Sequence, residues 1–186
     1  MIMDGTAQKR GRGYELRFER RLRHSPAGVW EWLTQPERLA TWLGDVEIDP
    51  QRGGRYRLRW LNAEQASERP MLIGEISEIE APRLLLVRYD YWAFEDGAAE
   101  FDRSGVPANP GTLQWELRAI DGGCLLTFVN VLDEFEELCA QTLAGWHVHL
   151  DFLEDALDGG AVDWGNWPHD RWQRHYERYR LQEAER

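Results

Sequence analysis

Residues 135–159 read FEELCAQTLAGWHVHLDFLEDALDG, and this stretch decides the fold. Its apolar side chains recur at steps of three and four, which is the spacing of one face of an α-helix. The residues on that face are Cys139, Leu143, Trp146, Leu150, Leu153 and Leu157. Before this stretch, residues 45–131 read as strands and turns. One long helix against a strand-rich body predicts a sheet that wraps around the helix.

The chain in front of the strand-rich region predicts one strand and two short helices. Residues 14–23 alternate between apolar and charged side chains, which is typical of a strand with one buried face. Ser25 and Pro26 suit the N-cap and the first position of a helix, and Pro36 opens a second short helix that Gly44 ends. The expected order is therefore strand, two short helices, about six strands and the long helix.

The remaining strands are expected to pair as hairpins, with one long loop among them. They cover residues 45–49, 55–61, 71–79, 84–92, 112–120 and 125–131. Gly53-Gly54 and Asp121-Gly122-Gly123 supply turn residues between neighbouring strands. Residues 94–111 are acidic and rich in glycine and proline, so we expect a long loop there.

Length and composition predict a single domain with an extension at each end. The chain has 186 residues, 42% of them hydrophobic, which is enough for one domain with its own core. We expect residues 1–13 to form a flexible arm, residues 14–159 the domain, and residues 160–186 a helical extension packed on it. The extension holds too many aromatic residues for a disordered tail: Trp164, Trp167, Trp172, Tyr176 and Tyr179. The same aromatic residues could instead form the seam of a homodimer.

The net charge and the cysteines narrow the classes of function. A formal charge of −11 opposes binding to nucleic acid, because such binding depends on neutralising phosphates. Cys124 and Cys139 have neither a metal-ligand spacing nor the density of a disulfide scaffold. No run reaches the roughly 18 apolar residues of a membrane span, and the N-terminus has no apolar signal region. We therefore expect a cytoplasmic protein that needs no cofactor.

The order of elements and several short motifs resemble the helix-grip fold of the START-like, or SRPBCC, superfamily. The motifs are Ser25-Pro26-Ala27-Gly28-Val29-Trp30, Trp32-Leu33-Thr34, Pro36-Glu37-Arg38-Leu39, Trp42-Leu43, Gly53-Gly54-Arg55, Gly74-Glu75-Ile76, Pro82-Arg83-Leu84, Leu126-Thr127-Phe128 and Gly145-Trp146-His147. Their order over residues 14–158 is most similar to the branch named after the ATPase activators of the 90-kDa heat-shock chaperone. The resemblance implies an α+β fold in which a curved antiparallel sheet of about six or seven strands holds a long C-terminal helix.

The resemblance also implies three kinds of function. Members of the superfamily bind lipids, sterols, polyketides or other apolar molecules between the sheet and the long helix, and a minority are cyclases or hydrolases. The branch name implies a chaperone partner and a link to the stress response. In the eukaryotic activators a separate N-terminal domain precedes this one, whereas here the first strand is expected near Tyr14. We expect a module that binds a small apolar or amphipathic molecule; the alternatives are a chaperone-associated interaction module and a cyclase or hydrolase.

Aromatic residues on the inward faces of the expected elements define the candidate ligand site. They are Trp42, Tyr56, Trp60, Tyr89, Trp115, Phe128 and Trp146. Flat apolar side chains favour ligand pockets, where they meet a few polar groups. The alternative is a core that these side chains fill completely, as in small barrels.

Arg20, Asn130 and His149 are polar candidates at positions that the pattern places inside. Arg20 and Asn130 could contact the headgroup of a ligand, with Asp90 as a carboxylate partner for Arg20. Alternatively, Arg20 lies near a strand end and extends to water. His149 could reach the edge of the cavity, or it could be a packed histidine with a local hydrogen-bond partner.

The sequence indicates neither a metal centre nor a nucleophile. His147 and His149 lie two positions apart, which is about 200° around a helix, so their rings diverge, whereas a helical metal pair needs a spacing of four. Asp151 lies four residues after His147, and we expect an exposed pair. Cys139 and His147 lie about 12 Å apart along the helix, too far for a nucleophile and its base. If the protein is a cyclase or hydrolase, the candidate acids, bases and polar groups are Arg20, Asp90, Asn130 and His149.

Overall fold

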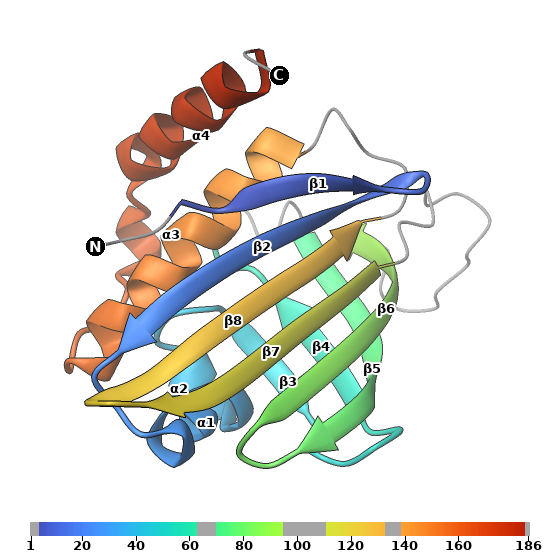
Figure 1. Ribbon diagram of the computed structural model, residues 1–186, viewed down its shortest axis with the longest axis vertical. Helices are drawn as coiled ribbons and strands as arrows, with labels where there is room; N and C mark the ends of the chain where they lie inside the picture. The colour runs from blue at the N-terminus through green and yellow to red at the C-terminus, as the bar shows by residue number, and fades with distance from the viewer. Residues whose placement is uncertain (1–3, 63–69, 95–110, 133–138, 185–186) are drawn as a thin grey trace.

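The computed structural model describes residues 4–62, 70–94, 111–132 and 139–184, and places a large antiparallel sheet against one long helix (Figure 1). The strands are β1 (Thr6–Arg10), β2 (Gly13–Leu22), β3 (Asp45–Ile48), β4 (Arg55–Arg59), β5 (Pro70–Glu80), β6 (Leu84–Phe94), β7 (Gly111–Ile120) and β8 (Gly123–Leu132). The helices are α1 (Pro26–Thr34), α2 (Pro36–Leu39), α3 (Cys139–Leu157), the 3-10 turn η4 (Trp164–Asn166) and α4 (His169–Ala184). The helix-grip prediction is confirmed by this order.

Within the described residues, eight strands form one sheet in the order β1-β2-β8-β7-β6-β5-β4-β3, and all neighbours are antiparallel. Phe18 in β2 lies opposite Phe128 in β8, and Phe128 lies opposite Trp115 in β7. Side chains directly opposite each other on one face interact across the strands. The register therefore places a row of aromatic rings on the face of the sheet that α3 covers.

The flexible arm predicted for residues 1–13 is wrong for residues 6–10, which form β1. This strand pairs with β2 through a turn at Gly11, whose φ of 61° suits glycine. Its side chains are mostly exposed, so the sequence carries no apolar alternation that would indicate a strand. Gly5 is nevertheless buried, and a Cβ at that position would lie 2.4 Å from the Phe18 ring. The chain at the start of β1 is therefore packed closely against the domain. With β1 included, the sheet has eight strands, whereas six or seven were predicted.

The first helix begins where the sequence predicts. The Ser25 side chain accepts a hydrogen bond from the Gly28 backbone N–H at 3.1 Å, and Pro26 is the first residue of α1. An N-cap of this kind satisfies one of the backbone donors that a helix start leaves unpaired. Val29 and Leu33 then point inward, and α1 contacts α2, β7 and α3.

The long helix α3 lies against the sheet, and α4 packs on the outer side of α3 (Figure 1). The helix predicted for residues 135–159 is confirmed over Cys139–Leu157, and the helix predicted after Pro168 is confirmed as α4. Residues 133–138 lie outside the described residues, as do residues 95–110, where the sequence predicts the long loop. None of the described helices has the length and apolar character needed to cross a membrane.

Candidate functional site

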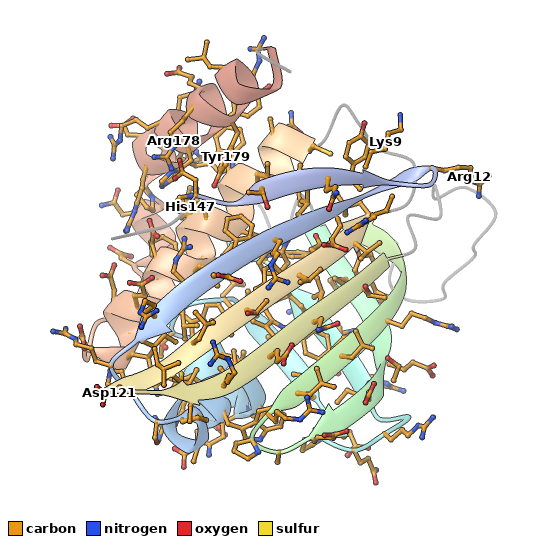
Figure 2. The ribbon with its side chains drawn as sticks, in the orientation of Figure 1. Lys9, Arg12, Asp121, His147, Arg178 and Tyr179 are labelled. Atoms are coloured by element: carbon orange, nitrogen blue, oxygen red, sulfur yellow. The ribbon has the colours of Figure 1, made fainter. Side chains whose placement is uncertain are left out.

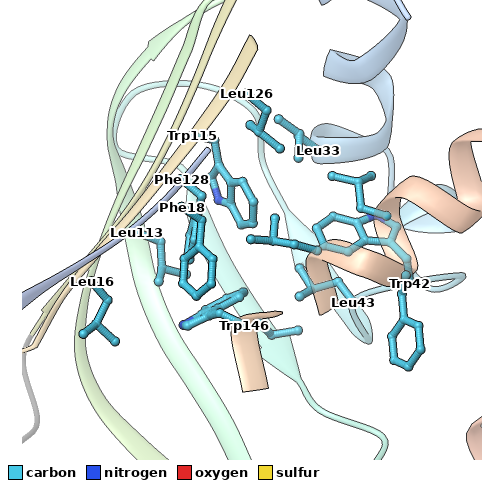
Figure 3. Close-up of a cluster of buried hydrophobic side chains, with 14 of the residues drawn as sticks. Leu16, Phe18, Leu33, Trp42, Leu43, Leu113, Trp115, Leu126, Phe128 and Trp146 are labelled. Atoms are coloured by element: carbon cyan, nitrogen blue, oxygen red, sulfur yellow. The ribbon is translucent and has the colours of Figure 1, made fainter. Parts of the chain in front are cut away.

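A group of aromatic rings occupies the space between the sheet and α3 (Figure 3). The ring centroids of Trp115 and Phe128 lie 4.1 Å apart, and those of Phe128 and Trp146 lie 4.4 Å apart. Trp42 meets Trp115 edge to face at 5.9 Å, and Trp60 meets Trp146 at 6.3 Å. Aromatic pairs in such geometry contribute about 0.5–1.5 kcal/mol each beyond their burial. Residues from β7, β8, α3 and the segments after α2 and β4 thus form one connected interior.

The aromatic candidates predicted from the sequence are all buried. None exposes more than 6% of its surface: Trp42, Tyr56, Trp60, Tyr89, Trp115, Phe128 and Trp146. The rings named above already contact one another, so a guest molecule between them requires the rings to move apart. The interior combines a large apolar surface with a small number of polar groups.

Asn130 is the best-connected of these polar groups. Its side chain has no exposed surface and donates from Nδ2 to the Tyr89 hydroxyl and to the Thr112 carbonyl, each at 3.0 Å. Its Oδ1 accepts a hydrogen bond from the Trp146 indole at 3.0 Å. Buried amides generally require such partners. Asn130 thus lies inward as strand alternation predicts, and it links β6, β7 and β8 to α3.

Tyr56 contributes a hydroxyl with a different environment. The side chain is 1% exposed, and burial raises the pKa of Tyr56, which keeps the hydroxyl protonated. A hydroxyl on a buried ring can donate to a polar atom that enters the interior, so Tyr56 is a candidate contact for a ligand.

Arg20 is buried and paired, so the prediction that it extends to water is wrong. Its Nε lies 3.0 Å from Glu154 Oε1, and its Nη2 lies 3.7 Å from Asp151 Oδ1. Both carboxylates belong to α3, whereas the sequence suggested Asp90 as the partner; the side chain of Asp90 lies outside the described residues. A buried guanidinium needs such partners, because an unpaired buried charge costs several kcal/mol.

The two histidines of α3 lie on different sides of the helix, as their spacing predicts. His149 is a packed histidine, since its Nδ1 lies 3.0 Å from the Trp42 carbonyl oxygen and its ring lies 5.5 Å from that of Trp167. Burial lowers the pKa of His149 to about 4. His147 does pair with Asp151, at 3.6 Å from Nε2 to Oδ1, but the predicted exposure of this pair is wrong because both side chains are buried.

Asp151 is the centre of a charged cluster between α3 and α4. We name it the Asp151 cluster; its members are Arg20, His147, Asp151, Glu154, Arg171, His175, Arg178 and Tyr179. The Arg171 Nη2 lies 2.9 Å from Asp151 Oδ2, and the His175 Nε2 lies 3.5 Å from the same oxygen. Burial alone would raise the pKa of Asp151, but the hydrogen bond from His175 and the nearby cationic groups hold that pKa below its ordinary value.

The local sequence pattern does not predict this cluster, because half of its residues come from α4. The one signal available in the sequence was the spacing of four between His147 and Asp151, which places both on one face of a helix. Arg171 and His175 share a face of α4 by the same rule, but nothing in the local pattern pairs the two faces. Only the packing of α4 on α3 brings them together.

His147, Asp151 and His175 carry metal-ligand atoms within 4.8 Å of one another. The hydrogen bonds around them argue against a metal centre. The Arg178 Nη2 lies 3.1 Å from His175 Nδ1, and a guanidinium can only donate; the Tyr179 hydroxyl lies 2.7 Å from His147 Nδ1. With each Nδ1 accepting from its neighbour, both Nε2 atoms carry a proton toward Asp151 instead of a lone pair for a cation. The guanidinium of Arg171 beside Asp151 would also repel a divalent ion.

The extension that follows α3 places two indoles against the domain. Trp164 and Trp167 are half-buried and lie parallel at 6.0 Å, and Trp167 lies 5.4 Å from the ring of Phe152. The Trp164 indole donates to the Ala40 carbonyl at 2.9 Å. A shallow pocket of about 190 Å³ lies beside them, lined by Phe152, Asp155, Ala161, Val162, Asp163, Asn166 and Pro168.

The fold and the interior together define a helix-grip protein of the START-like class. The sequence model of the family described as "Activator of Hsp90 ATPase homolog 1-like protein" matches residues 23–158, and the chain belongs to this family. This confirms the resemblance drawn from the motifs. Among curated proteins, none matches this chain.

Solved structures show the same fold at low sequence identity. CalU16 from Micromonospora echinospora has a TM-score of 0.64 and 20% identity, with 95% of this chain and 94% of that chain covered. The conserved protein of unknown function EF2215 from Enterococcus faecalis has a TM-score of 0.65 and 18% identity, with 96% and 91% covered. DynU16, described as a protein in the dynemicin biosynthetic locus, has a TM-score of 0.62 and 22% identity, with 79% and 48% covered. The high coverage of the first two extends beyond the region that the family model matches.

Proposed function

We propose that this protein binds a small apolar or amphipathic molecule between α3 and the sheet. The observation that carries the proposal is the group of buried aromatic rings between α3 and the sheet, among which the Tyr56 hydroxyl and the Asn130–Tyr89 pair supply a few polar atoms. A site of this kind suits a ligand with one hydrogen-bond acceptor on an apolar body. The START-like resemblance supports the location, since that superfamily uses the space between the sheet and the long helix.

The proposed site divides into an apolar wall and a polar point. The wall is formed by the rings of Trp42, Trp60, Trp115, Phe128 and Trp146. Tyr56 supplies the donor, and the paired group of Asn130 and Tyr89 supplies a polar surface within the interior. Arg20 and His149 would support the site without contacting the ligand. Arg20 pairs with Glu154 and His149 contacts the Trp42 carbonyl, so both hold α3 in place.

The test is quenching of tryptophan fluorescence by three probes: a fatty acid, a sterol and a flavonoid. Saturable quenching by one of them supports the proposal, because the interior tryptophans lie at the proposed contact surface. Tyr56→Phe should weaken that binding about fivefold to tenfold, the loss of roughly one hydrogen bond. Tyr176→Phe is the matched control and should leave the affinity unchanged, since Tyr176 lies half-buried on α4. If no probe quenches the fluorescence or shifts the melting temperature, the proposal fails.

A chaperone-associated interaction module is the second candidate. It is favoured by the family description and by the half-buried Trp164 and Trp167, which form an apolar surface outside the interior. Stimulation of the ATPase activity of the 90-kDa chaperone by the wild-type protein, reduced in Trp167→Ala, would support it. Stimulation without any ligand quenching would replace the first proposal by the second.

A further inference from the structure

The attachment of α4 to α3 combines a few buried or half-buried aromatic side chains with many polar contacts. Among the α4 side chains up to Leu181, Tyr179 alone is fully buried. Trp172 and Tyr176 are half-buried and stack on each other at 5.0 Å. Aromatic packing and the polar contacts of the Asp151 cluster therefore both attach α4 to the domain.

These contacts join α4 to both α3 and the N-terminal segment. The Tyr179 hydroxyl lies 2.7 Å from His147 Nδ1 and accepts a hydrogen bond from the Gly5 backbone N–H at 2.8 Å. The Arg178 Nη2 lies 2.7 Å from Asp4 Oδ1. Figure 2 shows His147, Arg178 and Tyr179 gathered where α4 meets α3 beside the start of β1. The N-terminal segment and α4 therefore meet at the Tyr179 hydroxyl, which lies against the buried imidazole of His147.

His147 has no position for an additional proton in the docked state. Because the Asp151 carboxylate can only accept, His147 Nε2 carries the proton that faces it, and Nδ1 accepts from the Tyr179 hydroxyl. We propose that the Asp151 cluster is a pH-sensitive latch, which holds α4 and the N-terminal segment on α3 at neutral pH and releases them in acid. A proton added to Nδ1 breaks the bond from Tyr179 and places a positive charge beside Arg178.

The charged and titratable groups around His147 come from every element that packs against it. Asp151 lies beside His147 on α3, and Arg20 on β2 pairs with both Asp151 and Glu154. On α4, Arg178 lies near His147 Nδ1, and the His175 ring stacks on the His147 ring at 3.9 Å. Asp4 in the N-terminal segment pairs with Arg178. Asp151 favours the imidazolium. Burial, together with His175, Arg20 and Arg178, outweighs Asp151 and lowers the pKa of His147 to about 3.

The direction of the pH effect follows from the proton balance. When α4 leaves, His147 becomes exposed and its pKa returns toward the ordinary value of about 6.5. Between pH 6.5 and about 3 the docked state therefore binds fewer protons than the released state. Docking is fully favoured above pH 6.5 and weakens about tenfold for each pH unit below it. The lowered pKa of Asp151 acts in the same direction at more acidic pH.

Hydrogen exchange of the full chain, corrected for the intrinsic effect of pH on exchange, tests the latch. Opening of the α4 amides should increase about 20-fold to 30-fold from pH 7 to pH 5, while the amides of β7 and β8 remain protected. His147→Gln should abolish most of this pH dependence. His149→Gln is the matched control, because His149 is equally buried on the same helix but faces Trp42 and Trp167; α4 should keep its pH dependence in this variant.

Two further variants keep the test decisive if His147→Gln does not fold. Tyr179→Phe and Arg178→Ala each remove a contact of the latch that opposes a proton on Nδ1, so α4 should open more at pH 7 and its opening should depend less on pH than in the wild type. The proposal is overturned if α4 protection is the same at pH 7 and pH 5, or if α4 opens only together with the sheet. Slower exchange of α4 on addition of Zn²⁺ at pH 7 would also overturn it, because the cluster would then be a metal centre.

Discussion

The two sides of α3 hold two histidines in contrasting ways. His149 packs among aromatic rings and makes one hydrogen-bonded contact, to the Trp42 backbone, whereas both ring nitrogens of His147 face polar side chains of the Asp151 cluster. Burial lowers the pKa of both, to about 4 and about 3 respectively. Burial alone therefore does not assign a role to a histidine. The elements packed on each side of the helix decide whether it fills space or joins segments.

The same contrast extends to the residues around each histidine. Apart from His149, the aromatic interior is stabilised by the removal of apolar surface from water, which is insensitive to pH. The Asp151 cluster is stabilised by pairing of charges that have lost their hydration, which depends on every partner being present and correctly protonated. Four measurements would sharpen or break this division.

The largest effect is expected from Trp115→Ala. The Trp115 side chain is 1% exposed and contacts Trp42, Phe128 and Trp146, so its removal leaves a cavity in the interior. We expect a loss of about 3–5 kcal/mol in the free energy of unfolding, measured by urea denaturation at pH 7. The control Trp172→Ala should cost clearly less, because Trp172 is half-buried on α4. Equal losses would contradict the idea that the interior carries the stability.

The second effect concerns the charge at the centre of the Asp151 cluster. Asp151→Asn removes the carboxylate charge that Arg171 and Arg20 face, and we expect a loss of about 3 kcal/mol in the free energy of unfolding at pH 7. Asp155→Asn is the matched control one turn along; its side chain is mostly exposed, so the expected change is below about 0.5 kcal/mol. A stabilising effect of Asp151→Asn would show that the charge is dispensable.

The third effect is a loss of stability as pH falls. Both histidines have folded-state pKa values below the ordinary 6.5, so each contributes stability that is complete above pH 6.5 and decreases toward pH 3–4. Each should cost about 2 kcal/mol between pH 6.5 and pH 5, from about 1.4 kcal/mol per pH unit. Urea midpoints at pH 7, 6 and 5 should show about half the wild-type slope in His147→Gln and in His149→Gln. An unchanged slope in either variant would show that this histidine does not contribute to the pH dependence of stability.

The smallest effect is expected from the polar group of the interior. Tyr89→Phe removes the hydroxyl that accepts from Asn130, while Thr112 still pairs with the same amide. The expected loss is about 1 kcal/mol in the free energy of unfolding. Tyr176→Phe, the control on α4, should change stability by less than about 0.5 kcal/mol. A loss larger than that of Asp151→Asn would show that the polar group of the interior stabilises the protein more than the Asp151 cluster does.

Much of the fold could be predicted because its signals are local. The spacing of Leu143, Trp146 and Leu150 indicates α3, and the Ser25 N-cap indicates the start of α1. Strand alternation also places Asn130 and the aromatic candidates inside. The short strand β1 escaped prediction because its exposed side chains leave no pattern, and it is recognised only by its pairing with β2.

The candidate site could be predicted only where it follows the inward faces of strands and helices. Alternation indicates that Arg20 is inward, yet its partners Asp151 and Glu154 lie on a helix that the local pattern cannot align with β2. The exposed His147–Asp151 pair was a reasonable expectation for an outer helix face. It is wrong because α4 covers that face.

By itself, the sequence determined the order of elements from β2 onward and most of the inward faces, because periodicity and capping act between neighbours along the chain, and its motifs indicated the START-like family. The tertiary structure alone decided the pairing of β1, the burial of Arg20 and the assembly of the Asp151 cluster. Those features depend on which faces of distant segments come into contact. The local sequence around a charged side chain does not indicate whether water or another helix covers it.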